Sequence, residues 1–269
     1  MTDTKQHSDL IEKLTDGIER LATSDEWVRY LDYQSRFHNY SFNNVLLIAA
    51  QCEHATMVAG FHSWRKMARF VRKGEKSIRI LAPMVYKNDD ADASDDRVIR
   101  GFKWVSVFDV SQTDGEDLPT VCSLLDGDDV SGAYGRLLAF ARGAGFQVED
   151  ATFADTRNGD CSHHLHRIRV AADRSESQRV KTLAHEIAHA LLHESFDSRA
   201  QAELEAESVA YVVCATLGIN SDDYSFGYVT TWAGGGDEAR DAVKAAGARI
   251  QKTAEQILTT FQHDAEEAA

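Results

Sequence analysis

The stretch LAHEIAHALLH, residues 183–193, contains three histidines at helical spacing, His185, His189 and His193. Glu186 follows directly after the first of them. Residues four apart on an α-helix are about 6 Å apart along its axis, so two such imidazoles can share one ion through bonds of about 2.1 Å. The stretch therefore predicts a helix that carries a metal site, and the fold of the second half of the chain is expected to form around it.

The spacing selects two of the three histidines. His185 and His193 are about 12 Å apart along the axis, which is too far for one ion. His189 and His193 are spaced correctly, but Ala190 follows the first and cannot act as a base. Only His185 and His189 combine two ligands with a carboxylate, Glu186, that can take a proton from a metal-bound water. His193 is expected to support the site from the helix end, where the helix dipole favours a histidine.

The third metal ligand is expected on the next helix. A third histidine in the pattern HExxHxxGxxH is excluded, because residue 195 is a serine. The segment AELEAESVA, residues 202–210, offers Glu203, Glu205 and Glu207. Glu203 and Glu207 share one helix face, from which Glu205 points away. We expect Glu203 to be the ligand and Glu207 to orient a ligand histidine, with Glu207 as the alternative third ligand.

Length and composition limit the class of protein. With 269 residues and 43% hydrophobic content, the chain can form two modest domains, each with its own core. It has no run of about 18 apolar residues and does not start like a secretory signal, so a cytoplasmic protein without a membrane partner is expected. The four cysteines form no CxxC pair, which argues against a disulfide framework or a zinc ribbon.

The net charge of −14 is distributed unevenly. Residues 60–79 contain seven Lys or Arg and one acid, whereas residues 88–129 contain twelve acids and three basic residues. Proteins that bind single-stranded DNA combine a basic groove with aromatic side chains on which bases stack. The basic stretch contains Trp64 and Phe70, although most aromatic side chains of this region are expected in the core. Residues 60–79 therefore predict a surface for single-stranded DNA.

Apolar periodicity predicts an α+β fold, with N-terminal helices and a small antiparallel sheet, followed by a short sheet packed on the metal-site helices. A polar, turn-rich segment suggests a boundary near residue 125, and hence domains 1–125 and 126–269. The strand at 167–172 is expected to pair with the backbone of a substrate. Helices are expected over 10–21, 24–37, 42–51, 62–71, 130–145, the motif, 200–218 and 236–262, and strands over 55–61, 77–86, 101–110, 146–150 and 166–172.

The metal-site segments resemble a known family. TLAHEIAHALLH, residues 182–193, followed by ELEAESVA, residues 203–210, is similar to the ImmA/IrrE-like zinc metallopeptidases. The third zinc ligand of that family is the glutamate of an ExxAxxxA pattern, which Glu203 matches here. Glu207 stands where the family commonly has asparagine.

The first half resembles a second family. YSFNNVLLIAAQ, residues 40–51, GFHSWRKMARFVRKGEKSIRILAP, residues 60–83, and VFDVSQTDG, residues 107–115, are similar to the N-terminal domain of the ArdC antirestriction proteins. That domain binds single-stranded DNA and is joined in the family to a zincin-like domain. One departure is Ala68, where the family often has glycine. The expected DNA contacts are Asn43, Trp64, Arg65, Arg69, Arg72, Lys73 and Lys76.

Together, the resemblances imply a single-stranded DNA-binding domain joined to a Zn2+-dependent, gluzincin-like endopeptidase with Glu186 as its base. They imply as substrate a DNA-associated protein, such as a transcriptional repressor or a restriction component. Tyr228 or a histidine is left open as the group that stabilises the oxyanion. The alternative is an antirestriction or DNA-protection protein whose zinc is structural or catalytically silent.

Overall fold

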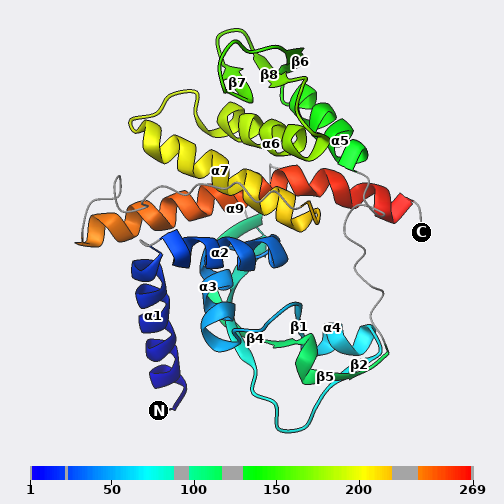
Figure 1. The fold of residues 1–269 in the computed structure, drawn as a ribbon. Coiled ribbons are helices and arrows are strands. Elements are labelled where there is room, and N and C mark those ends of the chain that lie inside the picture. Colours follow the sequence, from blue (N-terminus) through cyan, green and yellow to red (C-terminus); the bar gives the residue numbers. More distant parts are fainter. Residues whose placement is uncertain (1, 22–23, 88–96, 117–129, 220–235, 268–269) are drawn as a thin grey trace. The chain divides into compact units, whose positions relative to one another are not determined.

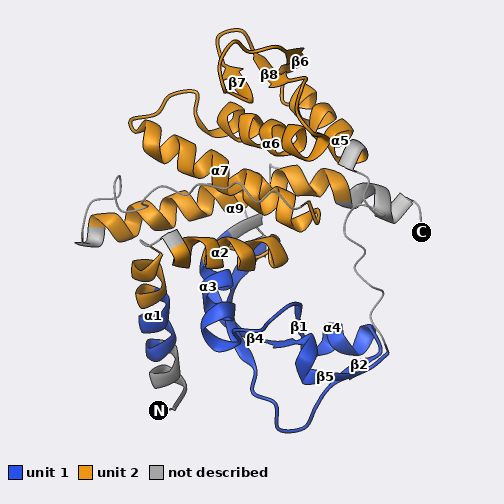
Figure 2. Cartoon of the chain, viewed as in Figure 1, with its two compact units in different colours: residues 1–14, 43–118 blue, residues 15–42, 119–269 orange. Residues whose placement is uncertain are grey.

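The computed structural model describes residues 2–21, 24–87, 97–116, 130–219 and 236–267 (Figure 1). The protein has the α+β fold that its sequence predicts. Two compact units are present, one formed by Met1–Leu14 with Asn43–Leu118 and the other by Thr15–Phe42 with Pro119–Ala269 (Figure 2). No helix among the described residues is long and apolar enough to cross a membrane.

Among the described residues, the two units differ from the predicted domains 1–125 and 126–269 at residues 15–42, which group with unit 2. Trp27 explains this grouping, because its side chain is fully buried and its Nε1 donates to the Ser208 hydroxyl at 2.9 Å. These two residues are 181 positions apart, so no local pattern announces the contact. The predicted boundary near residue 125 lies outside the described residues.

Unit 1 contains a three-stranded antiparallel sheet in the order β1-β4-β3 and a two-stranded sheet, β2-β5. Helix α1 (Thr2–Arg20) contributes residues to both units. The elements of unit 1 are α3 (Phe42–Gln51, whose first residue belongs to unit 2), β1 (Val58–Gly60), α4 (Phe61–Lys66), β2 (Arg69–Val71), β3 (Ile78–Lys87), β4 (Arg97–Asp109), a short 3-10 helix (Val110–Gln112) and β5 (Thr113–Gly115).

Two side chains of helix α3 form hydrogen bonds with backbone groups on the outer edge of β3. Asn44 donates to the Leu81 carbonyl at 2.8 Å and accepts from the Leu81 N–H at 2.9 Å. Gln51, two helical turns later, does the same for Arg79, at 2.9 and 3.0 Å. An edge strand exposes unpaired backbone groups, and here two side-chain amides pair with them. Asn44 and Gln51 of the segment YSFNNVLLIAAQ therefore have a structural role.

The predicted helix over 62–71 is wrong in its second half. Helix α4 ends at Lys66, and residues from Arg69 onward pair with β5 as strand β2. Between them, Ala68 has a φ of 54°, in the left-handed region that an α-helix does not contain. This φ favours glycine, which is the residue the ArdC-like pattern often has here. The opposing Gly115 is required, because a Cβ there would lie 2.3 Å from the Ala68 carbonyl oxygen.

Unit 2 is built around α6, which packs against α5, α7, β7 and β8 (Figure 1). Its sheet has the order β6-β8-β7, with β6 parallel and β7 antiparallel to β8. The predicted helices and strands of this region are present, and β7 is an additional strand. The elements are α2 (Ser24–Arg36), α5 (Val130–Gly143), β6 (Gln147–Ala151), β7 (Gly159–Ser162), β8 (Arg167–Ala171), α6 (Glu176–Leu192), α7 (Arg199–Thr216) and α9 (Gly236–Glu267).

Candidate metal centre

Helices α6 and α7 carry the candidate metal centre. The hydroxyl of Ser175 caps α6 by accepting from the Gln178 N–H, and Ser198 caps α7 in the same way. Ala206 and Ala210 of α7 are fully buried, and their small side chains allow the two helices to approach closely. The caps and the small residues therefore determine where side chains from the two helices meet.

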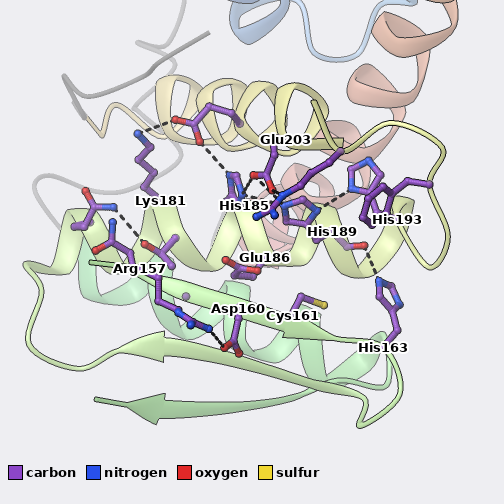
Figure 3. Close-up of a pocket in the computed structure, with 17 residues that line it drawn as sticks. Arg157, Asp160, Cys161, His163, Lys181, His185, Glu186, His189, His193 and Glu203 are labelled. Atoms are coloured by element: carbon purple, nitrogen blue, oxygen red, sulfur yellow. Dashed lines mark hydrogen bonds and ion pairs between the residues drawn. The ribbon is translucent and has the colours of Figure 1, made fainter. Parts of the chain in front are cut away.

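His185, His189 and Glu203 converge on one point (Figure 3). The Nε2 atoms of the two histidines are 3.0 Å apart, and Oε2 of Glu203 is 3.5 Å from that of His185 and 3.7 Å from that of His189. A tetrahedral ion with bonds of about 2.1 Å separates its ligand atoms by about 3.4 Å. The triangle has the size that a divalent metal requires, so these three residues could hold one.

Glu207 contacts the opposite side of the His185 ring. Its Oε2 is 3.0 Å from Nδ1 of His185, so the Nδ1–H donates to it and Nε2 keeps its lone pair for the site. The other oxygen, Oε1, forms an ion pair of 3.0 Å with Lys181. Glu207 therefore lies beside a histidine and is not among the three converging ligand atoms.

His193 supports His189 in a similar manner. The two Nδ1 atoms are 3.0 Å apart, and a hydrogen bond donated by His189 leaves its Nε2 lone pair for the site. Nε2 of His193 is 3.5 Å from Oε2 of Glu205, which also accepts from Nε of Arg249 at 3.0 Å. Glu205 points away from the converging atoms, as predicted, but it is buried. Arg249 comes from α9, and no sequence signal connects it to the motif.

Glu186 is 7% exposed and lines the same pocket as the histidines. Burial raises the pKa of its carboxyl to about 7. Strand β7 passes directly over this carboxyl at Gly159, where a Cβ would lie 3.0 Å from Glu186 Oε1 and 2.6 Å from Thr182 Cγ2. The close approach requires glycine and was not predicted from the sequence.

The pocket has a volume of about 910 Å³ and is lined by β7, α6 and α7. The prediction that 167–172 pairs with a substrate is wrong, because β8 lies in the middle of the sheet with both edges paired. Strand β7 lies at the edge of the sheet, and its residues Asp160 and Cys161 line the pocket. His163, another lining residue, donates from Nε2 to the His189 carbonyl at 3.1 Å. Tyr228 lies outside the described residues.

Three of the residues predicted to contact DNA form hydrogen bonds or ion pairs with other residues of unit 1. Trp64 is 0% exposed and donates from Nε1 to the Phe108 carbonyl at 2.9 Å, so its assignment as a DNA contact is wrong. Arg69 donates from Nε to the Thr113 hydroxyl at 2.8 Å. Arg72 is exposed but forms an ion pair of 2.9 Å with Glu75. Arg69 and Arg72 thus join β2 and the residue after it to β5, whereas Trp64 contacts β4.

The other predicted contacts differ in exposure. Arg65, Lys73 and Lys76 are exposed, whereas Asn43 is only partly so. Phe70, on β2 of the same basic stretch, is 56% exposed. An aromatic side chain flanked by basic residues is the better candidate for base stacking here. The sequence alone does not distinguish Phe70 from the buried aromatic residues.

Comparisons with known proteins match two separate segments of the chain. Residues 5–108 match the N-terminal domain of anti-restriction factor ArdC, and residues 144–215 match the IrrE N-terminal-like domain of the M78 peptidases. The chain joins an ArdC-like domain to an IrrE-like domain. The match to the IrrE-like domain includes α6 and most of α7, and the ArdC-like match contains the basic stretch.

Solved structures and one curated relative extend the likeness over most of the chain. The Mn(II)-bound ArdC protein from plasmid R388 has a TM-score of 0.56 at 20% identity, over 92% of this chain and 97% of that one. Its metal-free structure has a TM-score of 0.50 at 21% identity, over 82% and 85%. The uncharacterized protein pXO2-81 of Bacillus anthracis is 23% identical over 96% of this chain, which spans about half, 51%, of that protein.

Proposed function

We propose that this protein is a metal-dependent peptidase joined to a unit that binds single-stranded DNA. The peptidase proposal rests on the convergence of His185, His189 and Glu203 beside the buried Glu186. Zn2+ is the proposed ion, because two histidines, one carboxylate and an open position are typical of catalytic zinc sites. Mn2+ is the second ion to test, since one ArdC structure is Mn(II)-bound.

The proposed reaction is hydrolysis of a peptide bond. When bound, the ion lowers the pKa of a water molecule and polarises the peptide carbonyl. Glu186 would take a proton from water as the water oxygen attacks the peptide carbonyl carbon, and would pass that proton to the amine as the C–N bond breaks. Burial favours the protonated carboxyl, which supports the second transfer. Glu207 and His193 hold the two histidine rings with Nε2 toward the site.

The substrate is proposed to bind as an extended peptide along the outer edge of β7. An edge strand can add a further strand through main-chain hydrogen bonds, and Asp160 and Cys161 bring this edge to the pocket. A DNA-associated protein, such as a repressor or a restriction component, is the proposed substrate class. DNA bound by unit 1 would bring the peptidase to such a protein.

The DNA-binding proposal is supported by Arg65, Lys73, Lys76 and Phe70, which are exposed in unit 1. Lysine and arginine bind phosphates, and an exposed aromatic ring stacks on bases without regard to sequence. The proposed ligand is therefore a single strand of mixed sequence.

The peptidase is tested with the full chain, Zn2+ and an unfolded protein such as casein, with products identified by mass spectrometry. Cleavage is expected from the wild type and from Glu176→Gln, an exposed control on α6. It is expected to stop with a chelator and in Glu186→Gln. Equal cleavage by Glu186→Gln contradicts the proposal.

The second candidate function is DNA protection with a catalytically silent metal, which the ArdC antirestriction neighbours favour. Protection of single-stranded DNA from a nuclease distinguishes the two functions. Protection that survives unchanged in Glu186→Gln, together with no cleavage by the wild type, would support this second function.

A further inference from the structure

Lys181 is a buried lysine one helical turn before His185 on α6 (Figure 3). Its side chain is 8% exposed, and a lysine is rarely buried this far unless its charge is paired. Nζ of Lys181 is 3.0 Å from Oε1 of Glu207. The mechanism above gives Lys181 no part in proton transfer, so its burial needs a separate explanation.

The pair occupies both oxygens of Glu207. Oε1 faces Lys181, and Oε2 faces Nδ1 of His185 at 3.0 Å. Each contact limits the rotation of the Glu207 carboxylate, and the carboxylate in turn determines the plane of the His185 ring. A chain of contacts therefore runs from α6 to α7 and back to α6.

Glu207 also adds a negative charge to a crowded region. Glu186 and Glu203 line the same pocket, and residue 207 is commonly asparagine in the ImmA/IrrE-like pattern. A neutral amide at this position would need no counter-charge, whereas a largely buried carboxylate does. Lys181 supplies that charge, with Nζ 3.0 Å from Oε1 of Glu207.

We infer that Lys181 and Glu207 act as one charge-compensated unit that orients His185 for metal binding. Lys181 is a positioning residue that acts through Glu207. The inference rests on the proposed function, because it assumes that His185 binds a metal. It predicts that neither charge can be removed alone without loss, but that both can be removed together.

The prediction compares Lys181→Met, Glu207→Gln and the double variant. Lys181→Met leaves a largely buried carboxylate without its counter-charge, and Glu207→Gln leaves a buried ammonium facing a neutral amide. In the double variant both charges are gone, while the glutamine carbonyl still accepts from the His185 Nδ1–H. Lys244→Met, at an exposed position on α9, is the matched control.

The affinity for Zn2+ is measured in the full chain by competition with a chromophoric chelator. Each single variant is expected to lose about 10- to 100-fold in affinity, as is usual for residues that orient metal ligands. The double variant is expected to return to within about 3-fold of the wild type, because the two changes are coupled. The visible spectrum of the Co2+-loaded protein is expected to change in Lys181→Met and to recover in the double variant.

The competing outcomes separate the two proposals. Unchanged affinity in Lys181→Met, or losses that simply add in the double variant, would overturn the inference even if the wild type binds Zn2+ and cleaves protein. A wild type that binds neither Zn2+ nor Mn2+ overturns the inference and the proposed function together. If the single variants do not fold, recovery of folding and Zn2+ binding in the double variant supports the coupled unit, and failure of the double variant contradicts it.

Discussion

The candidate metal centre of unit 2 and the basic stretch of unit 1 both concentrate charged side chains, but they use them differently. At the candidate metal centre, the charges of the buried Lys181 and Glu205 and of the partly buried Glu207 are paired, and they hold two histidines in position. In the basic stretch, Arg69 and Arg72 contact the fold itself, and their neighbours extend into solvent. In the candidate metal centre, almost every charged residue is held in place by a contact with another residue. In the basic stretch, some residues contact the fold and the others are free to contact a ligand.

The largest effect is expected from breaking the metal centre itself. His189→Ala removes one of three converging ligand atoms and should weaken Zn2+ binding by about 1,000-fold or more. His193→Ala removes only the hydrogen-bond partner of His189 and should cost about 10- to 100-fold. Isothermal titration with Zn2+ measures both. Equal losses would mean that His193 is itself a ligand.

The next largest effect is expected on stability, where a buried and an exposed aromatic residue of the basic stretch are compared. Trp64→Ala should lower the free energy of unfolding of unit 1 by about 3–5 kcal/mol, because it empties a fully buried site. Phe70→Ala, at an exposed site, serves as the control and should leave stability nearly unchanged. Denaturant unfolding followed by tryptophan fluorescence, with circular dichroism as a second probe, provides the comparison. A stable Trp64→Ala would contradict the burial.

A substitution in strand β7, beside the candidate metal centre, is expected to have a smaller effect on stability. Gly159→Ala places a methyl group against Thr182 and Glu186 and should destabilise unit 2 by about 1–3 kcal/mol through overpacking. Gly135→Ala, on α5 with open space around the added methyl group, is the control. Thermal unfolding without metal measures the effect. A Gly159→Ala protein as stable as the control would show that β7 can move away from α6 at no cost.

On the surface of unit 1, Phe70→Ala should weaken binding of single-stranded DNA by about 1–3 kcal/mol, the value of one stacked base. Its affinity is measured by fluorescence anisotropy with a labelled oligonucleotide of mixed sequence. Phe61→Ala, which is also exposed but lies on α4, tests whether stacking is limited to β2. No change in either variant would remove the aromatic part of the DNA proposal.

The smallest effect is expected from single charges in the basic stretch. The logarithm of the binding constant falls linearly with the logarithm of the salt concentration. Lys73→Gln should make this slope shallower by about 0.7, the value of one phosphate contact on a single strand. Arg72→Gln should change the slope less, because this guanidinium is already paired with Glu75. Anisotropy titrations at several salt concentrations measure the slopes. A larger change in Arg72→Gln would mean that the ion pair opens on binding.

The sequence predicted much of the candidate metal centre and less of the basic stretch. Helical spacing is a local property, so the positions of His185 and His189 on one face follow from the chain alone. The roles of Trp64 and Phe70 could not be separated in this way, since both are aromatic residues in the same basic stretch. The exposure of each side chain depends on whether the neighbouring strands cover it. These strands, β4 and β5, begin only at Arg97 and Thr113, far along the chain from both residues.

The sequence by itself determined the α+β class, the motif helix and the faces on which its histidines and Glu203 lie, because secondary structure and its periodicity are encoded by near neighbours. Only the tertiary structure decided that Lys181 pairs with Glu207, that Arg249 supports Glu205 and that Gly159 passes over Glu186. It also decided that β7, rather than β8, lies at the edge of the sheet. These contacts join segments far apart in the chain, and packing alone determines which of the many possible partners meet.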